Sequence, residues 1–203
     1  MGYRPAENFP ELIESMKRAA AALRDADVPV LLGGGMAAWA RGGPPTDHDV
    51  DFYVRPEDAE RGLEVLVHLG LKPERPPEGW LLKAWDDEQL VDLIFNPAGG
   101  PIANEHFERA ERLEVMAQPL LVASIDDVMV MKLLSLREQE LDFQPALEIA
   151  RSLREQIDWT FVRERTADSP FAKAFFTLVA ELEIAVPTPV AQVRRLGVAR
   201  SSR

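Results

Sequence analysis

The stretch from Thr46 to Val54, Thr-Asp-His-Asp-Val-Asp-Phe-Tyr-Val, constrains this chain most, because three carboxylates alternate over five residues. The segment from Val50 to Val54 has the alternation of a β-strand, and residues two apart on a strand share a face. Asp49 and Asp51 are therefore expected side by side, where like charges repel unless a cation lies between them. Mg²⁺ suits such a pair, because it binds a few carboxylates together with phosphate oxygens of a substrate.

Three other interpretations of this stretch compete with a magnesium site. The simplest is a solvated acidic beginning of a strand. An EF-hand loop would need Gly at its sixth position and Glu at its twelfth, where this chain has Phe52 and Asp58. A transition-metal site at His48 is disfavoured, because adjacent strand residues point to opposite faces.

A magnesium–phosphate site also predicts a phosphate cradle and a further carboxylate, and the sequence offers both. The apolar run from Val28 to Leu32 predicts a buried strand, and Gly33-Gly34-Gly35 follows it and opens a short helix. Backbone N–H groups of such a turn can approach phosphate oxygens closely. Asp92 is the only charge in the apolar strand from Leu90 to Phe95. A buried charge is costly unless it is paired or coordinating; the alternative is the solvent face of an edge strand.

The same glycines match Gly33-x-Gly35-x-x-Ala38, which is similar to a dinucleotide-binding fingerprint. A dinucleotide site needs a full helix after the glycines. Gly42-Gly43-Pro44-Pro45 interrupts the chain too early for one, so the dehydrogenase interpretation is disfavoured.

The remaining pattern predicts an α/β (α+β) fold, with a mixed sheet and flanking helices followed by a helical segment. We expect a core over residues 1–123, helices over 124–185 and a flexible basic tail over 186–203. The expected helices span 9–25, 36–41, 55–69, 124–141, 145–157, 159–166 and 169–182, and the expected strands span 28–32, 50–54, 80–85, 90–95 and 113–122.

The composition of the chain limits the classes of partner that we expect it to bind. The 203 residues include no cysteine and carry a formal net charge of −11, with four of the 23 basic residues in the last ten. Binding along duplex DNA depends on Lys and Arg contacts to phosphates, so we expect no duplex DNA partner. No apolar run approaches the ~18 residues of a membrane span, and a cytoplasmic location with no membrane contact is expected.

The spacing of these motifs resembles that of a known family. Gly34-Gly35 follows a strand, thirteen residues intervene, and then come Asp49-Val50-Asp51-Phe52 and, later, Val91-Asp92-Leu93. The DNA polymerase β-like nucleotidyltransferase superfamily has a glycine pair, Asp-hydrophobic-Asp-hydrophobic and a third Asp in this order. The chain is most similar to its small bacterial members, the antibiotic nucleotidyltransferases and those of toxin–antitoxin systems, over roughly residues 28–95.

The resemblance implies transfer of a nucleoside monophosphate from a triphosphate such as ATP to an acceptor hydroxyl, with release of pyrophosphate. It implies a Mg²⁺ site, with two ions or with Mn²⁺ instead, on Asp49, Asp51 and Asp92, which are the expected catalytic residues. Asp47 leaves open which acids bind the metal, and the hydrophobic residues at 50 and 52 favour Asp49 and Asp51.

The resemblance also implies which residues contact the nucleotide. Gly33, Gly34 and Gly35 would hold the phosphates. Many members have Ser after the first Gly of the pair, so here that contact falls to backbone N–H groups or to Thr46. The stretch 125–134 resembles a helix of toxin-type members in which a Lys contacts the nucleotide, which implies Lys132; a solvated helix residue is the alternative.

The acceptor is not specified by these motifs and could be a small molecule such as an antibiotic, a tRNA end or a protein. An inactive binding protein of the same fold, or a toxin–antitoxin partner, is the alternative function. That alternative would use apolar residues of the C-terminal helices against another chain, namely Phe171, Phe175, Phe176, Leu178, Val179 and Leu182.

Overall fold

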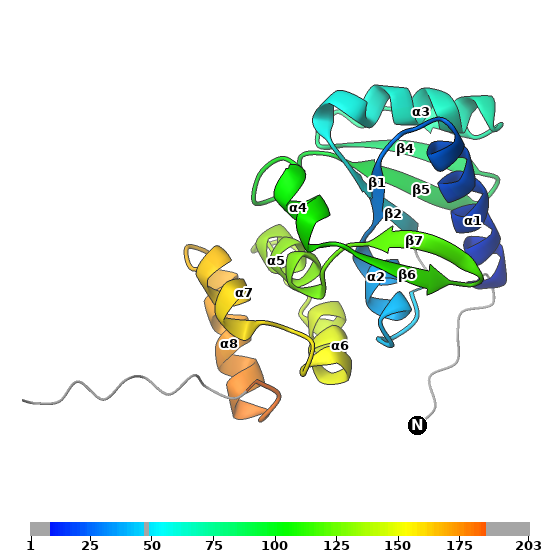
Figure 1. Ribbon diagram of the computed structural model, residues 1–203. Helices are drawn as coiled ribbons and strands as arrows, with labels where there is room; N and C mark the ends of the chain where they lie inside the picture. Colours follow the sequence, from blue (N-terminus) through cyan, green and yellow to red (C-terminus); the bar gives the residue numbers. More distant parts are fainter. Residues whose placement is uncertain (1–8, 47–48, 186–203) are drawn as a thin grey trace, which may run out of the picture.

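The computed structural model describes residues 9–46 and 49–185 and contains a mixed sheet flanked by helices (Figure 1). Its seven strands lie in the order β3-β4-β5-β2-β1-β7-β6. The strands are β1 (Val30–Leu32), β2 (Asp49–Val54), β3 (Lys72–Glu74), β4 (Leu81–Asp86), β5 (Gln89–Ile94), β6 (Glu111–Val115) and β7 (Gln118–Val122). The helices are α1 (Phe9–Asp25), α2 (Gly34–Ala40), α3 (Ala59–His68), preceded by a 3₁₀ turn (Pro56–Asp58), α4 (Asn104–Arg109), α5 (Ile125–Ser135), α6 (Gln144–Leu153), α7 (Trp159–Arg165) and α8 (Pro170–Glu181).

The predicted mixed sheet is confirmed. Strand β2 pairs in parallel with β5 and antiparallel with β1, while β1 pairs in parallel with β7. The hairpins β3–β4, β4–β5 and β6–β7 are antiparallel. The centre of the sheet therefore consists of strands that are distant in sequence, and each outer part is built from hairpins.

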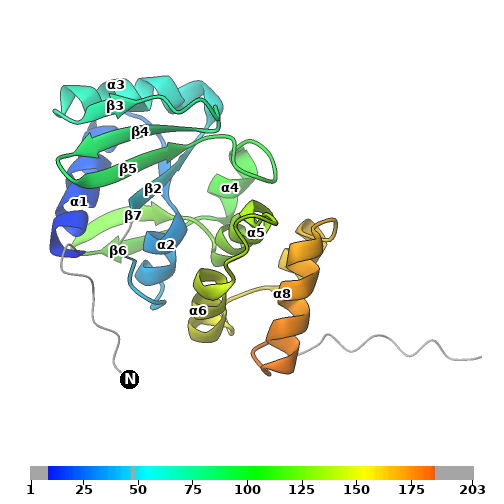
Figure 2. The same ribbon diagram turned by 180° about the vertical axis from the view of Figure 1, so that it is seen from behind.

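The two faces of the sheet differ in what covers them. Helices α1 and α3 pack against β2, β4 and β5 on one face, where Val50, Phe52 and Val54 are buried. Figure 1 shows α1 in front of the sheet, and Figure 2 shows the opposite face, with α2 against its centre. In the described part of the chain, no helix crosses β3, β4 and β5 on this face. Because side chains alternate along a strand, Asp49, Asp51 and Tyr53 belong to this second face.

The C-terminal helices are joined to the sheet through α5, which contacts α2 as well as α6, α7 and α8. Ser124 is the N-cap of α5, since its hydroxyl accepts a hydrogen bond from the Asp127 backbone N–H at 3.1 Å. The carboxylate of Asp127, 3 % exposed, accepts two bonds from the Arg109 guanidinium, at 2.8 and 3.0 Å. The second face of the sheet, which carries Asp49 and Asp51, thus lies beside α5, and these hydrogen bonds hold the first turn of α5 in place.

Several predicted boundaries are wrong. The helix predicted to continue to Leu141 ends at Ser135, and the charged residues that follow it have no apolar side to bury. The predicted strand 113–122 is a hairpin, whose turn residues Met116 and Ala117 have φ of 49° and 63°. Strand β3 and helix α4 were not predicted; β3 is an exposed edge strand containing a proline.

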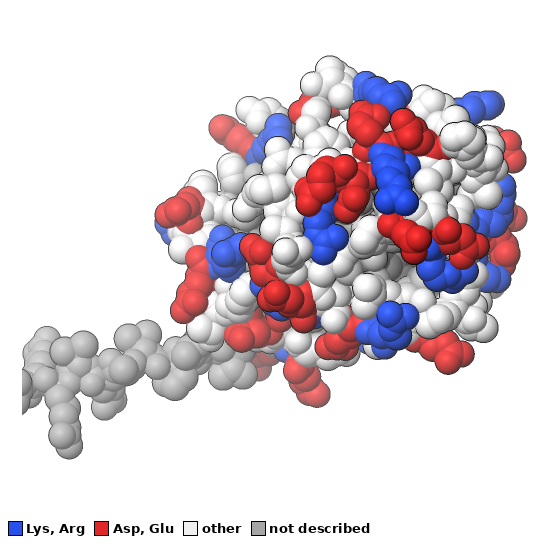
Figure 3. Space-filling model, turned by 45° about the horizontal axis from the view of Figure 1, so that its top comes forward, with Lys and Arg blue, Asp and Glu red and all other residues white. Residues whose placement is uncertain are grey.

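The charge distribution on the surface is mixed. Over the face shown in Figure 3, acidic and basic side chains are interspersed, and no continuous basic area crosses it. Among the described residues, no helix combines the length and the apolar character of a membrane span. The predicted tail, residues 186–203, lies outside the described residues, and the division of the chain near residue 124 stays a prediction.

Phe175→Ala should destabilise the whole chain. Phe175 is fully buried on α8 and packs against Phe143 with ring centroids 5.8 Å apart. Its truncation should lower the free energy of unfolding by about 3–5 kcal/mol, measured by urea denaturation followed by circular dichroism. Val67→Ala is the control, because Val67 is 41 % exposed and its change should cost under ~0.5 kcal/mol. Similar losses in both variants would contradict this packing.

Candidate metal and nucleotide site

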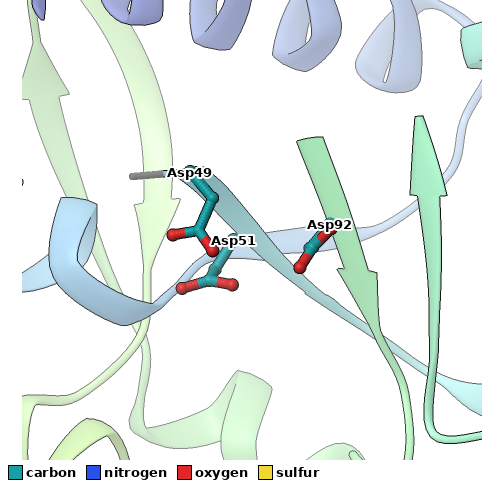
Figure 4. A group of neighbouring side chains, drawn as sticks. All are labelled: Asp49, Asp51 and Asp92. Atoms are coloured by element: carbon teal, nitrogen blue, oxygen red, sulfur yellow. The ribbon is translucent and has the colours of Figure 1, made fainter. Parts of the chain in front are cut away.

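The structure brings the three predicted carboxylates together. Asp51 on β2 lies directly opposite Asp92 on the parallel strand β5, and Asp49 lies two residues before Asp51 on the same face. One oxygen of each lies within 4.8 Å of one oxygen of the others (Figure 4). Asp92 is 4 % exposed on an interior strand, so the edge-strand alternative is wrong. The EF-hand alternative is also wrong, because β2 continues to Val54 instead of turning.

This arrangement is electrostatically unfavourable for the carboxylates alone. Burial, followed by the charges of Asp49 and Asp92, raises the pKa of Asp51 well above its ordinary value. Burial also raises the pKa of Asp92 to about 6, against the opposing effect of Lys83. Two carboxyl groups whose ionisation is opposed, with a third carboxylate beside them, are a set of oxygen donors that a hard divalent cation stabilises.

Lys83 is a site residue that the sequence analysis missed. Its ammonium group donates to both oxygens of Asp92, at 3.1 and 3.0 Å, from the neighbouring strand β4. The predicted strands 80–85 and 90–95 contained the signal, because pairing them across a turn at Asp87 and Glu88 places residue 83 directly opposite residue 92. Lys83 therefore compensates part of the negative charge on the side of the cluster away from β2.

The three glycines leave room for three side chains of the site. A Cβ on Gly33 would lie 2.3 Å from the Tyr53 ring, one on Gly34 would lie 1.6 Å from Asp51 Oδ2, and one on Gly35 would lie 2.8 Å from Thr46. Gly34 also has φ +50°, which favours glycine. The turn after β1 can thus approach β2 this closely because its three residues are glycines, which have no side chain.

Two backbone donors of this turn are bonded within the protein. The Gly33 N–H donates to the Asp51 carbonyl at 2.8 Å, and the Gly34 N–H donates to the Tyr53 hydroxyl at 3.0 Å. Tyr53 was not predicted as a site residue; burial and then the charge of Asp51 raise the pKa of its phenol, which keeps it neutral. The predicted phosphate contacts of the glycines stay a prediction, and what the structure shows for Gly33 and Gly34 is a steric role.

The other two predicted nucleotide contacts lie around the same cluster. Thr46 packs against Gly35 at the beginning of α2. Lys132 lies on α5, half-buried, and its positive charge lowers the pKa of Asp51, against the effect of burial. Asp47 and His48 lie outside the described residues. The described cluster therefore consists of Asp49, Asp51 and Asp92.

Gly34→Ala should damage both folding and the carboxylate cluster, because its Cβ would overlap Asp51 Oδ2. The matched control is Gly42→Ala, at φ +91° with no atom within 4 Å of the added Cβ. The control should cost only the backbone strain of roughly 1–2 kcal/mol. The free energy of unfolding of Gly34→Ala should fall by roughly 2 kcal/mol more, measured by urea denaturation. Equal losses in the two variants would contradict the steric role of Gly34.

Acidification should stabilise the chain in the presence of a chelator. The folded-state pKa of Asp92, about 6, lies above its ordinary value of 3.8, so the folded state binds more protons between these values. The stability that Asp92 contributes is then present below pH 3.8 and lost as the pH rises through 6. From pH 7 to pH 5, unfolding free energy should rise by about 1 kcal/mol through this group alone. The Asp92→Asn variant should lack this part of the pH dependence. If its stability changed with pH as that of the wild type does, the raised pKa of Asp92 would be contradicted.

The comparisons with known proteins give a structural result only. No protein-family model matches the chain, and no curated protein matches it. The fold is similar to that of ANT(2″)-Ia in its crystal structure with adenylyl-2″-tobramycin, with a TM-score of 0.59 at 15 % identity, over 80 % of this chain and 98 % of that one.

Two further solved structures are similar. JHP933 from Helicobacter pylori has a TM-score of 0.53 at 16 % identity, over 90 % of this chain and 82 % of that one. An antigenic nucleotidyltransferase-like protein from Paracoccidioides brasiliensis has a TM-score of 0.52 at 12 % identity, over 87 % of this chain and 94 % of that one. At such identities the similarity concerns architecture, and it agrees with the motif spacing. The chain has the α/β nucleotidyltransferase fold of these structures.

Proposed function

We propose that the chain transfers a nucleoside monophosphate from a nucleoside triphosphate to a hydroxyl group of an acceptor and releases pyrophosphate, in a Mg²⁺-dependent reaction. The observation that carries this proposal is the cluster of Asp49, Asp51 and Asp92 on one sheet face, beside the glycine turn between β1 and α2. The fold agrees with it, since ANT(2″)-Ia was solved with adenylyl-2″-tobramycin.

The residues present fit a divalent metal. All three donors are carboxylates, and their oxygens lie within 4.8 Å of one another. Burial and neighbouring carboxylates oppose the ionisation of Asp51 and Asp92. Asp49 and Asp51 would hold Mg²⁺, or Mn²⁺ in its place, and Asp92 could complete a second metal position. When bound, such an ion supplies positive charge for the triphosphate and for the leaving pyrophosphate.

The chain's own groups would perform the remaining steps. Asp92 would accept the proton of the attacking hydroxyl if it acts as general base, and a pKa of about 6 suits a base near neutral pH. The glycine turn, Thr46 and Lys132 would position the phosphates so that the α-phosphorus faces the acceptor. Positioning and electrostatic stabilisation dominate the catalysis of such transfers, so these contacts would contribute to the rate together with the metal.

The proposal also includes the chemical class of the acceptor. We propose a small molecule, with a tRNA end and a protein side chain as the alternatives, and no duplex DNA. A cytoplasmic location stays a prediction.

The inactive binding protein is not favoured. Phe175, Phe176 and Val179, which it would present to another chain, are at most 4 % exposed inside the chain's own fold.

Asp49→Asn should abolish Mg²⁺-dependent turnover, with a loss of at least ~10²-fold, because removal of a charge-stabilising group has effects of this size. Release of pyrophosphate from each of ATP, CTP, GTP and UTP measures turnover, and calorimetry with Mg²⁺ measures triphosphate binding. Asp25→Asn is the control, since the Asp25 side chain is 71 % exposed on α1. The proposal fails if triphosphate affinity is the same in the wild type and in the Asn variants of Asp49, Asp51 and Asp92.

A further inference from the structure

The two edges of the sheet differ in how they are protected from pairing with another chain. Strand β3 forms one edge and β6 the other, and Figure 1 shows β6 as the strand farthest from α3. An edge strand carries N–H and C=O groups that can pair with a further strand. Strand β3 has three residues, and the central one is Pro73, which has no N–H. Strand β6 has five residues and no proline, and in the described part of the chain no strand pairs with its outer side.

The pairing of β6 with β7 identifies the residues whose backbone groups point outward. In an antiparallel pair, positions where opposite residues exchange hydrogen bonds alternate with positions where they do not. Glu114 lies opposite Pro119, which has no N–H to exchange, so this is a position without exchange. Arg112 lies two residues away and is therefore another such position. The N–H and C=O groups of Arg112 and Glu114 thus point to the free edge.

These outward groups limit how a second copy of the chain can pair with β6 in the antiparallel direction. Three registers join them: Arg112 opposite the partner's Arg112, Glu114 opposite the partner's Glu114, or Arg112 of each copy opposite the partner's Glu114. The first two registers place like charges directly opposite each other, which is destabilising. The third forms two pairs of opposite charge, and it pairs all five residues of the strand, with Leu113 opposite the partner's Leu113.

The other side chains at this edge suit the third register. Leu113 is half-buried and would meet its counterpart on the two-fold axis. Met116 is 52 % exposed, and this register places it beside the partner's Ala110, which precedes β6 in an extended conformation. Glu111 is already paired with Arg41, at 3.1 Å. Charged residues usually protect an edge strand, but those of β6 complement a second copy of themselves.

We propose that β6 is a dimerisation edge, on which a second copy of the chain adds its own β6 in the antiparallel direction, with Arg112 of each copy opposite the partner's Glu114. The two sheets then form one continuous sheet. This inference does not rest on the proposed function. Strands β1 and β7 separate β6 from β2, so the dimer leaves the carboxylate cluster of each copy open. The contact is short, and we therefore expect a dimer that dissociates on dilution.

Sedimentation equilibrium of the full chain at several concentrations tests the proposal, in about 0.15 M salt to screen the net charge of −11. Arg112→Glu and Glu114→Arg each convert both pairs of opposite charge into pairs of like charge. The double variant restores opposite charges with the signs exchanged. Arg75→Glu is the matched control, because Arg75 is an exposed arginine directly after β3, at the other edge of the sheet. Circular dichroism verifies the folding of every variant.

The wild type should form a dimer, and each single reversal should weaken its association at least ~10-fold, because like charges opposite each other are costly. The double variant and Arg75→Glu should associate within about threefold of the wild type. A wild type that stays monomeric up to about 1 mM would overturn the proposal. Association that the single reversals leave unchanged, or that the folded double variant does not recover, would also overturn it.

Amide hydrogen exchange of the wild type tests the same edge without any substitution. The outward N–H groups of Arg112 and Glu114 should exchange at least ~5-fold more slowly at a concentration where the chain is mainly dimeric than in dilute solution. The N–H of Leu113, which faces β7, is the internal control and should change less. Exchange at Arg112 and Glu114 that does not depend on concentration would contradict the proposed pairing.

Discussion

Repulsion between three carboxylates is the constraint on which the rest of this site depends. Asp49, Asp51 and Asp92 are held with oxygens within 4.8 Å of one another, although burial and the neighbouring carboxylates oppose the ionisation of Asp51 and Asp92. Only a rigid surrounding can maintain such an arrangement, since relaxation would separate the charges. The parallel pairing of β2 with β5 supplies that rigidity from inside the sheet, and Lys83 and Lys132 supply part of the compensating charge.

The register of the central strands decides the chemistry. A shift of one residue between β2 and β5 would move Asp92 to the face covered by α1 and α3. Val91 and Leu93, both fully buried on that face, fix the register through packing. The hydrophobic core therefore positions the polar site, although the two lie on opposite faces of the same strands.

Local patterns in the sequence predicted the elements that carry the site, and contacts between distant segments escaped them. The alternation around Asp49 and Asp51 and the lone charge at Asp92 were visible because periodicity and an apolar run are local properties of the sequence. The helix 9–25 was predicted with its observed bounds for the same reason. Tyr53 was missed because its role depends on the approach of Gly33 and Gly34 from another strand. The turn at Met116 and Ala117 was missed because neither residue is typical of positive φ.

The overlap between a side chain at position 34 and the carboxylate of Asp51 links two positions that are seventeen residues apart. A lineage that keeps the acid must keep the glycine, whereas loss of the acid releases position 34 from this steric requirement. In descendants of this chain, a side chain at position 34 would thus indicate that the Asp51 carboxylate has moved or has been lost, and an alignment would reveal it.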